Sequence, residues 1–177
     1  MENKREFKYY PEDFGLLPAK PLHMDLTFDM HEDHAFVTNN FTMQNKGSPL
    51  SRLELDAKNL DIKGVYLYID EDGKGEYNKI IHEYNKDENK LILYFQNQIK
   101  ENAKFTIRTE NSCIPTHNIL EGMYYDETPI GAPKTIITQC QQWGFSRIVP
   151  CFDDMAAKCT YTTTIIADSR YTNLISN

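Results

Sequence analysis

The chain has 177 residues, 40% of them hydrophobic and 25% charged, which is typical of one globular domain with a sizeable core. The net charge of −7 and the lack of a Lys/Arg-rich cluster argue against a nucleic-acid partner. No stretch approaches the roughly 18 apolar residues of a membrane span, and residues 1–20 are too charged for a secretory signal. We therefore expect a cytoplasmic protein with no membrane partner.

The N-terminal part of the sequence divides into an arm and a hairpin. Residues 1–20 are charged, contain two prolines and show no periodicity, so we expect an extended arm. Residues 22–30 then alternate strictly between apolar and polar side chains, which predicts a half-buried strand. Residues 36–43 resume the alternation after a polar turn, and the two segments together predict a β-hairpin.

Short strands account for most of the rest of the chain. We predict an irregular segment at 111–133, a helical turn within 152–158, and further strands at residues 53–57, 60–69, 77–84, 90–95, 103–109, 135–141 and 161–167. The apolar frame slips at Lys63 and Gly64, which predicts a bulge there. No helical periodicity is sustained anywhere. The sequence therefore predicts an all-β fold, an antiparallel β-sandwich or saddle-shaped pair of sheets, in a single domain over residues 1–177.

The histidines and cysteines do not form a metal-binding pattern. Residues 31–34 read His-Glu-Asp-His, but the zinc motif H-E-x-x-H places its histidines four residues apart on a helix. We therefore interpret this segment as a solvated hairpin turn. The cysteines lack C-x-x-C spacing and are predicted to be reduced thiols: Cys113, Cys140, Cys151 and Cys159. We predict no metal site, no catalytic residue and no bound cofactor in this chain.

Two glutamines are the candidate binding residues. Residues 135–141 have the β-branched character of a strand, along which Gln139 and Gln141 would project to the same side. Two neighbouring carboxamides offer carbonyl acceptors and NH2 donors that can hold a small polar group. The same pattern is also that of the wet face of an ordinary strand.

The segment TQCQQWGFSRIVPCFDDMAAKCTYTTTIIAD, residues 138–168, resembles the end of the N-terminal domain of zinc aminopeptidases of the aminopeptidase N and leukotriene hydrolase family. The similarity is closest to the bacterial aminopeptidase N branch, which residues 120–124 and 166–168 also match. It extends weakly to residues 22–29 and so covers nearly the whole chain.

The resemblance implies a function in a larger enzyme. This chain would be the N-terminal β-domain of a zinc metallo-aminopeptidase that removes N-terminal amino acids from peptides. Zinc would be held by a catalytic domain absent from these residues, so the chain alone is expected to be inactive. The partners would be that catalytic domain and a peptide with a free N-terminus.

The resemblance also gives the two glutamines separate roles. The residue matching Gln139 lines the pocket for the first side chain of the substrate, and the residue matching Gln141 helps to hold its α-amino group. Most family members have glutamate at the second position. A glutamine there can still accept a hydrogen bond from an ammonium, but without the attraction between two charges.

Two other interpretations stay open at this point. Relatives of such domains also occur in scaffold proteins, so the chain could be a non-catalytic protein-interaction β-domain, for which the eleven tyrosines would supply contacts. A carbohydrate-binding β-sandwich would need exposed aromatic residues on one sheet face. The single tryptophan, inside the family-like segment, makes that interpretation the weaker one.

Overall fold

The computed structural model describes residues 15–70, 75–171 and 173–176. Most of the predicted arm at residues 1–20 therefore lies outside the described residues. Residues 15–19 have no strand structure, and the first strand begins at Lys20. Within the described ranges, no helix is long and apolar enough to cross a membrane.

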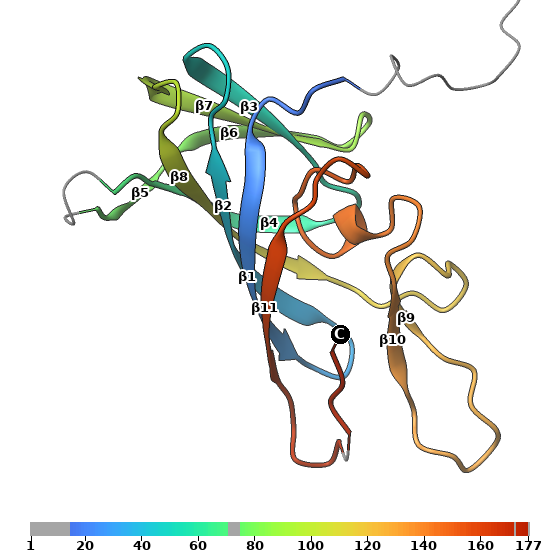
Figure 1. Cartoon of the computed structure of the whole chain (residues 1–177). Helices are drawn as coiled ribbons and strands as arrows, with labels where there is room; N and C mark the ends of the chain where they lie inside the picture. The colour runs from blue at the N-terminus through green and yellow to red at the C-terminus, as the bar shows by residue number, and fades with distance from the viewer. Residues whose placement is uncertain (1–14, 71–74, 172, 177) are drawn as a thin grey trace, which may run out of the picture.

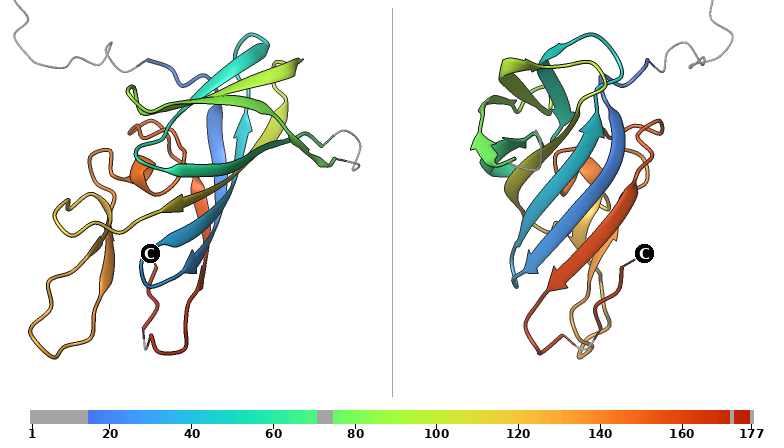
Figure 2. Two further views of the ribbon diagram at one scale, coloured as in Figure 1. Left: turned by 180° about the vertical axis from the view of Figure 1, so that it is seen from behind. Right: turned by 60° about the vertical axis from the view of Figure 1, so that its left-hand side comes forward.

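A six-stranded sheet is the centre of the fold, with the strand order β11-β1-β2-β8-β4-β5 (Figures 1 and 2). Its strands are β1 (Lys20–Met30), β2 (Ala35–Gln44), β4 (Asp61–Tyr68), β5 (Tyr77–Lys79), β8 (Lys104–Cys113) and β11 (Thr160–Ile166). Neighbouring strands are antiparallel except at one edge, where β11 runs parallel to β1. This pair departs from the predicted antiparallel arrangement, because the long chain segment between the two strands lets β11 enter the sheet in the same direction as β1.

Two smaller sheets complete the fold. A three-stranded sheet with the order β3-β7-β6 lies across one end of the larger sheet, at the top of Figure 1. In a separate two-stranded ribbon, β9 pairs with β10. In Figure 1 this ribbon lies below the η2 turn, away from the three-stranded sheet. The bounds are β3 (Leu50–Asp56), β6 (Ile81–Asn85), β7 (Lys90–Ile99), β9 (Gly122–Tyr125) and β10 (Ile136–Gln139). The predicted all-β fold is confirmed.

The core lies between the inner faces of the two larger sheets. Every second residue of β2 and β8 is buried, as alternation along a strand requires. The ring of Phe105 from β8 meets Phe95 from β7 edge to face at 6.1 Å, which joins the two sheets. Phe41 from β2 packs in the same way on Phe152 at 5.8 Å, so the segment after η2 also covers the core.

Most strand predictions are confirmed, including the hairpin of β1 and β2. The predicted bulge is present as a shift of register between Ile62 and Gly64 in the pairing of β4 with β8. A Cβ at Gly64 would meet the Tyr66 ring at 2.7 Å, so a side chain at this position would displace that ring. The predicted strand at 77–84 is in fact two strands in different sheets, β5 and β6, because the backbone at Ile80 bonds to Val65 and then leaves the larger sheet.

Two local predictions are wrong. Residues 111–133 are not irregular throughout, since they include the end of β8 and all of β9. The strand β9 depends on pairing with β10, a contact that no local pattern encodes. Residues 152–158 form bends and turns without a helical turn, and the helical element lies earlier, in the 3-10 turn η2 (Phe145–Arg147).

Candidate functional site

The two predicted binding residues lie at the end of the β9–β10 ribbon. Gln139 is the last residue of β10 and pairs with Gly122 of β9. The predicted strand 135–141 is therefore too long: Cys140 follows it without strand structure and Gln141 lies in a turn. Both glutamine side chains are exposed.

The turn after Cys140 reverses the chain sharply. Gln142 and Trp143 both have left-handed backbone angles, with φ of 57° and 67°. The amide of Gly144 donates to the carbonyl of Cys140 at 3.3 Å and closes the turn. A Cβ at Gly144 would lie 2.4 Å from the carbonyl oxygen of Gln139, so the returning chain approaches β10 more closely than any side chain would allow. This reversal ends the strand before Gln141.

Hydrogen bonds and one ion pair hold the turn on the body of the domain. The Nε of Arg147 in η2 donates to Glu121 at 3.0 Å, just before β9 begins, and this arginine side chain is only 12% exposed. The backbone amide of Ser146 donates to the carboxylate of Asp153 at 2.9 Å, and its hydroxyl donates to the carbonyl of Trp143 at 3.3 Å. Arg147 and Asp153 therefore have structural roles in holding the turn.

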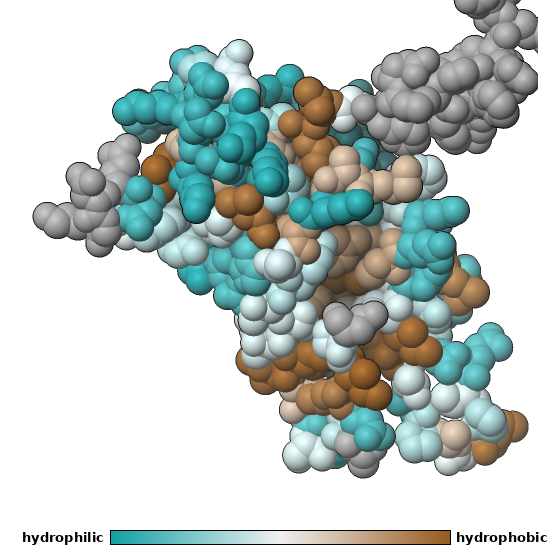
Figure 3. Space-filling model, viewed as in Figure 1, coloured by the Kyte–Doolittle hydropathy of each residue, from teal (hydrophilic) through white to brown (hydrophobic). Residues whose placement is uncertain are grey.

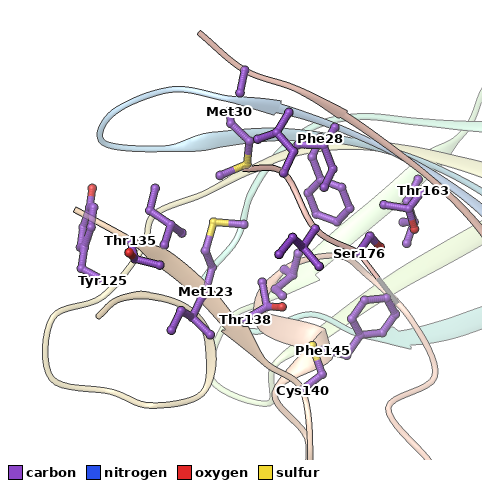
Figure 4. Close-up of a pocket in the computed structure, with 18 of the residues that line it drawn as sticks. Phe28, Met30, Met123, Tyr125, Thr135, Thr138, Cys140, Phe145, Thr163 and Ser176 are labelled. Atoms are coloured by element: carbon purple, nitrogen blue, oxygen red, sulfur yellow. The ribbon is translucent and has the colours of Figure 1, made fainter. Parts of the chain in front are cut away.

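An apolar hollow of about 1770 Å³ lies beside this turn. Figure 4 shows Phe28 and Met30 of β1 on one side of it, with Thr138, Cys140 and Met123 from the ribbon on the other. Residues 173–176 also line the hollow. Figure 3 shows apolar side chains gathered in the lower part of the molecule. Exposed apolar side chains that line the hollow include Leu174 and Ile175.

The two glutamines differ in whether they line the hollow. Thr138, Cys140 and Gln141 line the hollow, whereas Gln139 is not among the residues that line it. Successive residues of a strand point to opposite faces, which explains why Thr138 and Cys140 line the hollow and Gln139 does not. The turn then brings Gln141 round to the hollow. Of the two candidates, Gln141 has the position suited to a ligand in this hollow, and its binding role stays a prediction.

The thiols near the turn are poor nucleophiles. Burial, and then the negative charge of Asp153, raise the pKa of Cys140 above its ordinary value. Burial raises the pKa of Cys151 much further and also raises that of Cys159. Because these thiols stay protonated at neutral pH, they do not supply the thiolate that covalent catalysis needs.

The histidine-containing segment 31–34 forms the turn between β1 and β2. The rings of His31 and His34 stack at 4.6 Å, and the Nδ1 of His34 lies 2.7 Å from the carboxylate of Asp33. Within the described ranges, no three His, Cys, Asp or Glu side chains come together to hold a metal ion. The described residues therefore do not fit a zinc site, and no chemical step in this chain is assigned to zinc.

Comparison with known families identifies the class of protein. Residues 20–177 match the family described as the Peptidase M1 N-terminal domain. The chain therefore belongs to the M1 aminopeptidase family, as an N-terminal domain of one of its members. No curated protein matches the sequence significantly. The similarity to the bacterial branch stays a prediction.

Sequence reasoning missed one prominent feature of the site. Trp143 is 63% exposed and lines the hollow two residues after Gln141. A second, smaller hollow of about 560 Å³ also includes Trp143, together with Phe152, Asp153 and Asp154. The available signal was that Trp143 is the only tryptophan in the chain and stands beside a glycine, where a turn is expected.

Proposed function

We propose that this chain binds the free N-terminus of a peptide as the N-terminal domain of a zinc aminopeptidase. The observation that carries the proposal is the position of Gln141 on an exposed turn at the edge of an apolar hollow. Its carbonyl oxygen can accept a hydrogen bond from the peptide ammonium, while apolar walls contact the first side chains. Family membership supports a peptide substrate.

The chemistry itself belongs to another part of the enzyme. A catalytic domain would hold zinc, which polarises the scissile carbonyl and activates water when bound. This chain's contribution is to hold the N-terminus so that the first peptide bond is presented in one orientation. We therefore expect the isolated chain to bind peptides without hydrolysing them, and we place the enzyme in the cytoplasm.

Substitutions at Gln141 test this proposal directly. A peptide with a free N-terminus should bind more tightly than its N-acetylated form, because acetylation removes the ammonium. Gln141→Glu adds an ion pair and should strengthen binding of the free peptide by about 0.2–1 kcal/mol, the range for an exposed pair. Gln141→Ala should weaken it. Measured by titration calorimetry, equal binding of both peptides to all three proteins would disprove the assignment.

The second candidate function is a non-catalytic protein-interaction domain. It is favoured by the exposed apolar side chains around the hollow, which suit a protein surface as well as a peptide. The acetylation experiment separates the two, since a protein-interaction surface has no reason to distinguish a free amine.

A further inference from the structure

Three polar side chains lie together on the core-facing side of the six-stranded sheet. Asn39 of β2 and Thr109 of β8 are fully buried, and Asn111 of β8 is 1% exposed. Asn39 and Thr109 are directly opposite each other in the pairing of the two strands. Asn111 follows Thr109 by two residues and therefore points to the same face. The pairing of β2 with β8 thus brings three hydrogen-bonding side chains into one part of the core.

Four polar atoms of these side chains have no hydrogen-bond partner among the described residues. They are the Nδ2 and Oδ1 atoms of Asn39, the Oγ1 atom of Thr109 and the Oδ1 atom of Asn111. Burial without a partner costs each atom the hydrogen bonds that it makes with water in the unfolded chain. Folded proteins therefore satisfy most buried polar groups, either from the protein or through ordered water. The four atoms together point to a bound partner.

Another buried asparagine, Asn45 just after β2, shows how this fold satisfies such a side chain from its own backbone. Its Nδ2 donates to the carbonyls of Ser48 and Ile99 at 3.0 Å each. Its Oδ1 accepts a hydrogen bond from the amide of Gly47, also at 3.0 Å. Asn45 and Asn39 are equally buried. They differ in that the backbone supplies partners only to Asn45.

The chemistry of the four atoms decides which partner fits. The Nδ2 of Asn111 donates to the carbonyl of Ile148 at 2.9 Å, which fixes the orientation of this amide and leaves its oxygen as an acceptor. Asn39 presents one acceptor and one amide donor, and the Thr109 hydroxyl can act as either. A cation would meet the amide hydrogens of Asn39, and an anion would meet two amide oxygens. Water can donate to the oxygens and accept from the amide, so it suits the whole set.

We propose that Asn39, Thr109 and Asn111 form the binding site of an internal water molecule that bridges β2 and β8. Opposite residues of antiparallel strands have Cβ atoms about 4.5–5.5 Å apart, and a step of two residues along a strand covers about 7 Å. One water with hydrogen bonds of about 2.8 Å on either side joins polar atoms about 5.5 Å apart, which matches this spacing. Because Asn111 also holds the carbonyl of Ile148, the residue that ends η2, the water would link both strands to that turn. The site does not depend on the proposed function.

Nuclear magnetic resonance detects such a water directly in the whole chain. In a rotating-frame Overhauser experiment, the side-chain amide of Asn39 and the methyl group of Thr109 should show cross-peaks to water with the sign of a dipolar contact. The Thr109 hydroxyl exchanges its proton with solvent and could relay this signal, so the experiment is repeated with Thr109→Val. The methyl groups of Ile99 are the control, because Ile99 is fully buried and lies beside Asn45, six residues from Asn39 along the chain.

Unfolding in urea gives a second test, because the sign of the change depends on the water. If water bridges these groups, Thr109→Val should lower the midpoint by about 0.5 M, since the remaining amides and the water lose a partner. Combining it with Asn39→Leu should cost less than the sum of the two single changes, because two apolar side chains of similar shape expel the water. Thr162→Val, the same change at an exposed position of β11, should leave the midpoint nearly unchanged.

The outcomes that overturn the water site are distinct. If Thr109→Val raises the midpoint, the hydroxyl is unpaired and its removal relieves the cost of burying it. If Thr109→Val lowers the midpoint but Asn39 shows no cross-peak to water, the two side chains bond directly to each other. A cross-peak at Asn39 that persists in Thr109→Val, together with a lowered midpoint, supports the site.

Discussion

Four glycines allow the forces that shape the candidate site to be measured separately. At Gly122, at the start of β9, φ is +71° and a Cβ would lie 2.6 Å from the Cβ of Arg147, so both backbone angle and space oppose a side chain. Gly131 has φ of +88° with nothing within 4 Å, so only the angle opposes one. Gly144 has an ordinary φ of −86°, and only space opposes a Cβ there. Gly47 has neither constraint.

The expected loss of stability on substitution by alanine follows from these geometries. Gly131→Ala should cost about 1–2 kcal/mol for the left-handed angle, reduced by the lower entropy of the unfolded chain. Gly144→Ala should cost about 1–3 kcal/mol or more, because the atom it meets at 2.4 Å is the backbone carbonyl oxygen of Gln139. Gly122→Ala combines both effects at about 2–5 kcal/mol, and Gly47→Ala should be neutral or slightly stabilising.

Equilibrium unfolding in urea measures all four free energies under one condition. The slope against denaturant should be unchanged among the variants, so that differences in midpoint report stability. The reasoning is refuted if Gly144→Ala is as stable as the natural chain, or if Gly131→Ala costs as much as Gly122→Ala. In the double variant of Gly122 and Gly144 the costs should not add, since a Cβ at Gly144 also lies 3.0 Å from the amide nitrogen of Gly122.

Two more predictions concern side chains of the turn. Arg147→Met should lower the free energy of unfolding by about 1 kcal/mol, a loss limited by the 44% exposure of its partner Glu121. High salt should reduce the difference between the variant and the natural chain. A loss of stability that is independent of salt would contradict a role for the ion pair. Because burial and Asp153 raise the pKa of Cys140, its thiol should react with a thiol reagent at pH 8 more slowly than free cysteine does. The reaction should become faster as the pH rises. The rate is measured in a Cys159→Ser background, where a rate equal to that of free cysteine would contradict this prediction.

The fold could be predicted from the sequence wherever one face of a strand is buried. Alternation of apolar and polar residues locates β1, β2 and β8, and a slip in that alternation locates the bulge at Gly64. Two of the departures from prediction involve long-range contacts. β9 forms because β10 pairs with it, and β11 joins the sheet parallel to β1 although its own sequence only indicates a strand.

The sequence supplied two candidate residues for the site, whose binding roles stay predictions, but it did not supply the geometry of the site. The resemblance of residues 138–168 to the family identified Gln139 and Gln141, and the family is confirmed. Only Gln141 lines the hollow, and it lies in the turn after β10, where the left-handed residues Gln142 and Trp143 reverse the chain. A prediction from sequence pattern extends a strand as far as the next glycine or proline. Here the chain reverses at Gln142 and Trp143, before Gly144.

The position of Gln141 depends on residues that are distant from it in the sequence. The reversal that carries Gln141 is bounded by η2, and η2 is attached to β9 through the bond between Arg147 and Glu121. The lack of a side chain at Gly122 lets Arg147 approach to make that bond, and the lack of one at Gly144 lets the chain return against Gln139. A change near residue 122 should therefore alter binding at residue 141 even though some twenty positions separate them, because Gly122 and Gln139 pair at the same end of the ribbon and the backbone of Gly144 packs closely against both.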